Sequence, residues 1–298
     1  MTDHTGKDGE ARRTKLIQLA AGMLVGLGFG LVMSLVSNGF VAGVVWLTSL
    51  RETQLAAWLG LEPVLAAMMP LICLLVAAFL ILQVRRLFGI TRWHGPADSI
   101  FAAHRTDNEL DIRSGFGSTI AALISAGGGA SVGQYGPLVH FGATMGSAFR
   151  ALTGGMLTTD VFIGCGVAGA IAAGFNAPIA GVVFAHEAIL RHFSMRAIAP
   201  IAVASISSSW FSQQIFGAAP LLDFASMALD LGIVLPAALV LGPVFGLVAV
   251  VFMVCVRSSL RFAATSGWSP ARLVFLAAGI TGLVGIFVPE VLGLGTGP

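Results

Sequence analysis

The chain has 298 residues, of which 56% are hydrophobic and only 10% are charged, and its net charge is +2. A soluble domain of this length needs far more polar surface, so the composition predicts an integral membrane protein in contact with the lipid bilayer. The small net charge gives no indication of a nucleic-acid partner.

Long, weakly charged apolar runs occur along the whole chain, and a helix needs ~20 apolar residues to cross the hydrocarbon. The runs therefore predict an all-α polytopic (multi-pass) membrane protein. They cover residues 16–50, 59–84, 114–149, 161–190, 197–215, 231–256 and 273–294. The 38 glycines suit helices that approach one another closely or break inside the membrane.

The first 15 residues are polar, and the apolar run that follows them is too long for the core of a signal peptide. We expect this segment to be a cytoplasmic tail. Basic residues precede the first run and follow the second, which predicts that both flanks face the cytoplasm at a cell (inner or plasma) membrane. These residues are Arg12, Arg13, Lys15, Arg85, Arg86 and Arg92.

Two segments interrupt the series of predicted membrane-crossing helices. Residues 89–113 are polar, and Pro96 within them suits the first turn of a small helix. Residues 126–146 hold G-G-G and G-Q-Y-G-P, and a helix cannot run smoothly through Gly136 and Pro137, because proline lacks an N–H and its ring clashes with the preceding turn. We expect one helix to end near the glycines and another to begin with Pro137 in its first turn.

A helix start at membrane depth would be a site for an anion. It presents free backbone N–H groups and the positive end of the helix dipole. Broken helices aimed at an ion near the midplane recur in transporters, and non-helical backbone at that depth is buried in protein or lines a watery cavity. The alternative is that Gly-Pro only kinks a helix for packing, since both residues are frequent in spanning helices.

Two stretches resemble the CLC family of chloride channels and chloride/proton antiporters. G-G-G-A-S-V-G-Q-Y-G-P-L-V-H-F-G (127–142) is similar to the family's G-(K/R)-E-G-P loop, and G-V-A-G-A-I-A-A-G-F-N-A-P-I-A-G-V-V-F-A-H-E (166–187) is similar to its F-N-A-P signature. The ending V-P-E-V-L-G-L-G-T-G-P resembles its Pro-Glu-x-x-Gly-x-Gly stretch. The resemblance implies an inverted-repeat bundle with broken, re-entrant helices, assembled as a homodimer. It also implies chloride or another small inorganic anion as the ligand, with no cofactor.

The family's G-x-E-G-P loop has a glutamate whose carboxylate occupies the outer anion site until it is protonated. The residue at that position here is the only tyrosine of the chain. A phenol stays neutral near neutral pH, because its ordinary pKa is about 10. It can donate a hydrogen bond to an anion or block the path with its ring. We predict an anion-binding gate made by Gly133, Gln134, Tyr135, Gly136 and Pro137.

The antiporters of the family use a second glutamate after F-N-A-P, and an ungapped alignment puts Ala188 there. Glu187 precedes this position and faces about 100° away from it, unless the helix slips. With both proton carriers replaced, we expect passive conduction. His186 and Glu187 are the candidates for a rewired proton relay, and His140 is also titratable. Hydrogen-bonded packing is the more common role of a histidine in an apolar helix. An ion pair with Arg191 one turn later is an equally simple account of Glu187.

The family's G-S-G-I-P motif, which supplies a serine hydroxyl and another helix start, has a weak counterpart in W-H-G-P. Trp93 or His94 replaces the serine, so the hydroxyl is lost. Pro96 still allows a helix start with free N–H groups. His94, Gly95 and Pro96 are therefore a candidate second helix-start site, and its departure from the motif leaves room for an anion other than chloride.

The family's second inverted half carries a G-x-F-x-P loop and a late tyrosine. No tyrosine follows Tyr135 in this sequence, and the letters G-x-F-x-P occur only at 285–289, overlapping the V-P-E ending. We therefore expect the second repeat to be incomplete and the chain to be truncated. The expected organisation is a polar tail (1–15), a first transmembrane repeat (16–220) and the start of a second repeat (221–298).

The remaining polar residues indicate no enzyme. Cys73, Cys165 and Cys255 are far apart in apolar runs, which predicts buried thiols rather than a disulfide or a metal site. There is no nucleophile–base pair at motif spacing, no metal-ligand cluster and no phosphate-binding loop, so no catalytic residue is predicted. The leading hypothesis is a CLC-type anion channel or uncoupled transporter. The alternatives are a non-conducting membrane scaffold or subunit and an antiporter with a rewired proton path.

Overall fold

The structure is a computed structural model that describes residues 4–51, 55–58, 60, 62, 66–105, 110–152, 157–217 and 231–293. Within these ranges the secondary structure is helical, with no strand, so the predicted all-α class is confirmed. The chain divides into two compact units, residues 1–221 with 278–298 and residues 222–277, and each is described by itself. The boundary expected at residues 220 and 221 lies outside the described residues.

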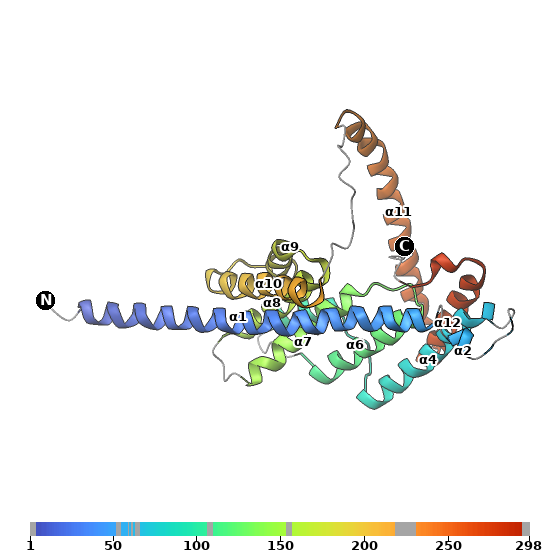
Figure 1. Cartoon of the computed structure of the whole chain (residues 1–298), viewed down its shortest axis with the longest axis horizontal. Helices are drawn as coiled ribbons and strands as arrows, with labels where there is room; N and C mark the ends of the chain where they lie inside the picture. Colours follow the sequence, from blue (N-terminus) through green and yellow to red (C-terminus); the bar gives the residue numbers. More distant parts are fainter. Residues whose placement is uncertain are drawn as a thin grey trace. The chain divides into compact units, whose positions relative to one another are not determined.

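The first unit contains most of the helices (Figure 1). They are α1 (His4–Ser49), α2 (Leu55–Trp58), α4 (Met69–Phe88), α5 (Pro96–His104), α6 (Ile112–Gly127), α7 (Tyr135–Leu152), α8 (Thr159–Phe175), α9 (Pro178–Phe184), the π-helix η2 (Ala185–Leu190) and α10 (Met195–Phe216). Residues 278–287 of α12 (Pro270–Phe287) and the short 3-10 helix η3 (Pro289–Val291) also belong to it.

Among the described residues, four helices are long and apolar enough to cross a membrane: Leu19–Ser49, Met69–Phe88, Gly232–Thr265 and Pro270–Phe287. Each overlaps a predicted apolar run. Two other runs are broken rather than continuous, because 114–149 divides into α6 and α7, and 161–190 divides at Asn176. Helix α1 begins at His4, so helical backbone extends into the segment expected to be a polar tail.

Glycines allow the helices of the first unit to cross closely. A Cβ on Gly142 of α7 would collide with the carbonyl of Gly166 in α8, and the reverse substitution would collide with the carbonyl of Gly142. A Cβ on Gly26 of α1 would lie 2.5 Å from the carbonyl oxygen of Pro200 in α10. Small residues at such crossings are typical of membrane helix packing, where backbones approach closely. Figure 1 shows α1 running alongside α7, α8 and α10.

Hydroxyl groups lie buried between α1, α8 and α10. Ser34 and Ser212 are in hydrogen-bond contact at 3.1 Å, and Asn38 donates to the Ser212 hydroxyl at 2.8 Å. Ser208 donates to the carbonyl of Gly169 at 2.8 Å. These bonds satisfy polar groups that would be costly to bury alone, so they hold α10 in register against α1 and α8.

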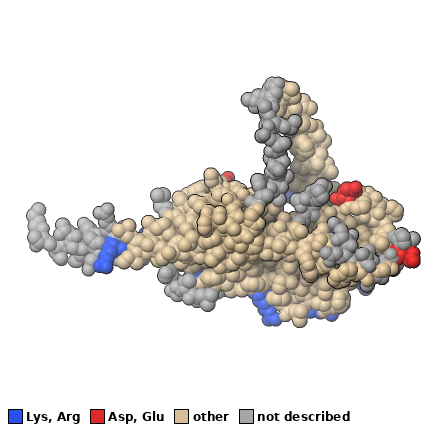
Figure 2. Space-filling view, in the orientation of Figure 1, with Lys and Arg blue, Asp and Glu red and all other residues tan. Residues whose placement is uncertain are grey.

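The second unit contains α11 (Leu231–Thr265) and the first residues of α12. Helix α11 is apolar on every side and its side chains are exposed, which is typical of a membrane segment. Figure 2 shows few Lys, Arg, Asp or Glu side chains on the visible face of the molecule. Of the three thiols predicted to be buried, Cys165 in α8 is buried, Cys73 in α4 is only partly buried, and Cys255 on α11 is exposed, so the prediction is wrong for Cys255.

Candidate functional site

The predicted helix break is confirmed in the first unit. Helix α6 ends at Gly127, and Gly129 adopts φ +104°, a conformation that favours glycine. The carbonyl of Gly129 accepts a hydrogen bond from the N–H of Gly293 at 3.0 Å. Helix α7 then begins at Tyr135, with Pro137 in its first turn. The kink alternative is therefore wrong, because residues 128–134 separate two distinct helices.

The start of α7 presents backbone donors. The first N–H to bond back along the chain is that of Leu138, which donates to the carbonyl of Gln134 at 3.4 Å. Among the described residues, the N–H groups of Tyr135 and Gly136 have no acceptor, and Pro137 has no N–H. The Gln134 side chain is only 5% exposed, and its Oε1 has no hydrogen-bond partner there. Gly133 is exposed in the loop before it.

The ring of Tyr135 rests on the end of α8. It stacks on Phe175 with ring centroids 3.8 Å apart and planes inclined by 29°. A Cβ on Gly174 would lie 2.8 Å from the Cε1 atom of the tyrosine, so a glycine is needed where the ring passes. The phenol hydroxyl makes no hydrogen bond to the described residues. The ring is thus fixed by packing, while its hydroxyl is available as a donor.

The end of α8 is in turn held by α10. Asn176 caps α8 in the left-handed conformation, with φ +51°, which asparagine tolerates better than most residues. Its Oδ1 accepts two hydrogen bonds at 2.7 Å, from the Ser209 hydroxyl and from the Gln213 amide. Because Asn176 directly follows Phe175, these bonds fix the backbone that carries the ring against Tyr135.

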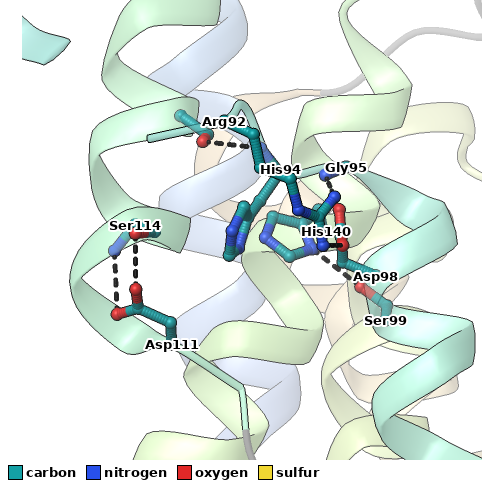
Figure 3. A network of polar contacts seen from close by, with 9 residues as sticks. Arg92, His94, Gly95, Asp98, Ser99, Asp111, Ser114 and His140 are labelled. Carbon is teal, nitrogen blue, oxygen red and sulfur yellow. Dashed lines mark hydrogen bonds and ion pairs between the residues drawn. The ribbon is translucent and has the colours of Figure 1, made fainter. Parts of the chain in front are cut away.

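The second candidate helix start is that of α5. Gly95 has extended backbone and Pro96 begins the helix, as predicted. The N–H of Gly95 donates to the Asp98 carboxylate at 2.8 Å, and Arg92 forms an ion pair with the same carboxylate (Figure 3). Burial would raise the pKa of Asp98, but these two contacts hold it below its usual range. The chain therefore supplies its own anion at this helix start.

The structure brings the two helix starts together. A Cβ on Gly136 of α7 would lie 3.6 Å from the Cγ atom of Pro96 in α5. Residues that are 40 apart in the sequence thus lie side by side. The positive ends of two helix dipoles add at this place, and that favours a negative charge beside them.

Hydroxyl groups reach this site from neighbouring positions, which the motif comparison missed. The N–H of His94 donates to the Ser118 hydroxyl of α6 at 3.0 Å, and Ser99, one turn into α5, lies 2.9 Å from Nδ1 of His140. The serine lost from the W-H-G-P segment is therefore not the only hydroxyl available. No spacing in the sequence marks Ser118, because its position depends on how α6 packs.

His140 and His94 also meet here, which the sequence did not predict. Their rings are 5.9 Å apart and inclined by 70°. His140 is 1% exposed, and its Nε2 is buried without a partner among the described residues. The Nδ1 atom of His94 is likewise buried and unpartnered there. Figure 3 shows the His140 ring between His94 on one side and Ser99 on the other.

His186 and Glu187 lie elsewhere, on the π-helix η2. Nδ1 of His186 donates to the carbonyl of His192 at 3.1 Å, and the ring stacks on Phe193 at 5.1 Å. These contacts support the packing interpretation of His186. Glu187 is exposed, and no ion pair with Arg191 is recorded although the structure describes both residues. The ungapped alignment put Glu187 about 100° away from the position of the second family glutamate unless the helix slips. A π-helix at Ala185–Leu190 is a departure of that kind from the regular α-helix.

The sequence was compared with known families and proteins. The family model described as voltage gated chloride channel matches residues 78–298. A putative chloride channel protein, ClcB-like, of Ralstonia nicotianae is 30% identical over 214 residues, which cover 67% of this chain and 48% of that protein. The voltage-gated ClC-type chloride channel ClcB of Shigella boydii is 24% identical over 225 residues, or 74% of this chain and 53% of that protein. The chain spans about half the length of these curated relatives.

Solved structures give the same result for the fold. A CLC-type fluoride/proton antiporter superimposes with a TM-score of 0.78 at 22% identity, over 93% of this chain and 68% of that one. A slow cyanobacterial Cl⁻/H⁺ antiporter superimposes with a TM-score of 0.77 at 20% identity, over 92% of this chain and 66% of that one. The predicted bundle with broken helices is therefore confirmed.

Proposed function

Since the chain belongs to the voltage gated chloride channel (CLC) family, we propose that it conducts a small inorganic anion past the paired starts of α5 and α7. The observation that carries this proposal is the juxtaposition of Pro96 and Gly136, with unpartnered N–H donors at the start of α7. A helix start carries about half a positive charge, and two adjacent starts attract an anion more strongly than one.

The donors for the anion come from α7. At α5 the Asp98 carboxylate already accepts the N–H of Gly95, so that helix start is partly neutralised. The N–H groups of Tyr135 and Gly136 are the donors there that could contact an anion. The chemistry of these neutral donors suits chloride, fluoride or another small anion, and requires no cofactor.

Tyr135 serves as the gate of this pathway. Its ring lies against Phe175 and Gly174, so it narrows the approach to the α7 start, and its hydroxyl can donate to a passing anion. A neutral phenol neither mimics an anion nor exchanges protons readily near neutral pH. We therefore favour passive conduction over obligatory exchange for protons. A homodimer, a cell-membrane location and a cytoplasmic N-terminus are parts of the same proposal.

The test compares two variants of the gate in liposomes loaded with chloride. Tyr135→Glu introduces a carboxylate beside the anion site, and Tyr135→Gln is the neutral control of similar reach. We expect Tyr135→Glu to conduct less chloride than Tyr135→Gln at neutral pH, because the carboxylate competes with the anion. The difference should disappear below about pH 4, where a carboxyl group with an ordinary pKa of about 4.3 becomes protonated.

Chloride efflux is measured with a chloride electrode while the external pH is recorded. Equal flux through both variants at every pH would refute the placement of Tyr135 at the gate. Proton movement in fixed proportion to chloride in the wild-type chain would refute passive conduction and favour an antiporter. A folded chain without flux would favour the alternative of a membrane scaffold or subunit.

A further inference from the structure

Two histidines from distant segments, the buried His140 and the half-buried His94, form a pair beside the helix starts. His94 precedes α5 and His140 lies in α7, yet their rings are 5.9 Å apart in a T-shaped arrangement. Each ring has one buried nitrogen without a hydrogen-bond partner in the described part of the chain, Nδ1 of His94 and Nε2 of His140. A buried polar atom without a partner is destabilising, so these two nitrogens require an explanation.

Ser99 contacts the Nδ1 atom of the His140 ring. Its hydroxyl lies 2.9 Å from Nδ1 and has no other hydrogen-bond partner among the described residues. A hydroxyl donating to Nδ1 leaves the proton of the neutral imidazole on Nε2. The unpartnered Nε2 lies on the side of the ring away from Ser99 and toward His94 (Figure 3).

The pair is one helical turn from the start of α7. His140 follows Gly136 by four residues, so both lie on the same face of α7, about 6 Å apart along the helix axis. Ser99 follows Pro96 by three residues and lies on the matching face of α5. Pro96 contacts Gly136, and Ser99 contacts His140. The contact between α5 and α7 therefore has the two helix starts at one end and the imidazole rings at the other.

We propose that His94 and His140 form a proton-binding site whose occupation strengthens anion binding at the start of α7. This inference rests on the anion site proposed above. A carboxylate gate is negative without its proton and competes with the anion, whereas an imidazole is neutral without its proton and positive with it. Proton and anion therefore bind together at this site, and by linkage each strengthens the binding of the other by the same factor.

The charged groups around the pair are few. Asp98 interacts electrostatically with both imidazoles, Asp111 interacts with His94, and Arg92 offsets the charge of Asp98. From η2, which packs on α5, His186 is turned to the His192 carbonyl and Glu187 is exposed. From α8, Asp160 pairs with His192. From α7 itself, Tyr135 lies at the start of the helix.

Burial disfavours an imidazolium that has no counter-ion. The pair should therefore take up its proton mainly when an anion arrives to balance the charge. A unit charge about 6 Å from the anion, at an effective dielectric constant between that of protein and water, strengthens binding roughly tenfold.

The experiment measures chloride and fluoride binding by titration calorimetry with the full 298-residue chain in detergent. Titrations at about pH 5 and about pH 8 bracket the ordinary imidazole range. In weakly buffered solution, a pH indicator then records proton uptake when chloride replaces isethionate at constant ionic strength. We expect roughly tenfold tighter binding at the lower pH and uptake of up to about one proton per chain.

His140→Gln and His94→Gln should each abolish the proton uptake and the pH dependence while leaving a folded chain that still binds the anion. His94→Gln serves if His140→Gln fails to fold, because His94 is only half-buried. The matched control is His104→Gln, an exposed histidine on the same helix α5, which should behave like the wild type.

Three outcomes overturn the inference. If the wild type binds the anion with an affinity that does not depend on pH, the proton-binding inference is overturned but the proposed anion site is not. Persistence of the acid response in both His94→Gln and His140→Gln also overturns it, since the proton then binds elsewhere. Failure of folded wild-type chain to bind chloride or fluoride at any pH overturns the proposed anion site and this inference together.

Discussion

Gly174 lies against the ring of Tyr135, and replacing it with alanine should displace the gate. The new Cβ would lie 2.8 Å from Cε1 and 3.0 Å from Cδ1 of the tyrosine. Ordinary contact between carbon atoms begins near ~3.4 Å, so the ring must move by at least about 0.6 Å. Such a shift disturbs the stack on Phe175, whose centroid distance is only 3.8 Å.

The size of the effect follows from the stack. An aromatic pair contributes about 0.5–1.5 kcal/mol beyond its area burial, and about 1.4 kcal/mol is a factor of ten in population. Gly174→Ala should therefore raise the population of displaced ring by up to about tenfold. Alanine is favoured over glycine within a helix, so α8 itself should not be destabilised.

The chain has one tyrosine, which allows a direct assay. Growth with 3-fluorotyrosine places a single fluorine label at Tyr135, and one fluorine NMR resonance then reports the environment of the ring. We expect Gly174→Ala to shift or split this resonance and to increase chloride efflux from liposomes. The control is Gly39→Ala in α1, where a Cβ meets nothing within 4 Å. A resonance and a flux unchanged from the wild type would refute this account of the gate.

Two further predictions concern stability. Gly166→Leu should separate α7 from α8, because even a Cβ at this position collides with the Gly142 carbonyl. Size-exclusion chromatography should show loss of folded chain. Elution like that of the wild type would contradict this account of the packing between α7 and α8. Asp111→Ala should lower the free energy of unfolding by about 0.5–2 kcal/mol by removing the N-cap of α6. The hydrogen bond from Ser114 holds the pKa of Asp111 low, so this difference should be present at neutral pH and disappear as the pH falls through the lowered pKa. Thermal unfolding across that range checks it, and a difference that grows in acid would contradict it.

The helix starts were predictable from the sequence because their causes are local. Proline at Pro96 and Pro137 forbids a continuing helix whatever surrounds it, and glycine before each proline supplies the flexible backbone. The starts of α5 and α7 were therefore located from a few residues each. The end of α8 was not predicted, although Asn176 takes the left-handed conformation there.

The contacts between these helix starts were not predictable in the same way. The stack of Tyr135 on Phe175 and the pairing of His94 with His140 join residues about 40 positions apart, and they depend on which helix faces pack together. The sequence directed attention to His186 and Glu187 instead, because they stand next to a recognisable motif. Only the packing of α5 on α7 shows that His94 and His140 share an environment.

A π-helix such as η2 forms when one residue is inserted into an α-helix and the segments on both sides of the insertion keep their positions. One flank is anchored where the Pro178 carbonyl accepts the Ser205 hydroxyl at 2.7 Å, and the other where Leu190 is 2% exposed. The surplus residue is therefore absorbed as a bulge, which turns the following side chains by about 100° relative to an unbroken α-helix. Counting residues from Pro178 consequently does not tell which side of the helix Glu187 or Ala188 occupies, and a one-residue deletion within η2 would turn its side chains without moving either anchor.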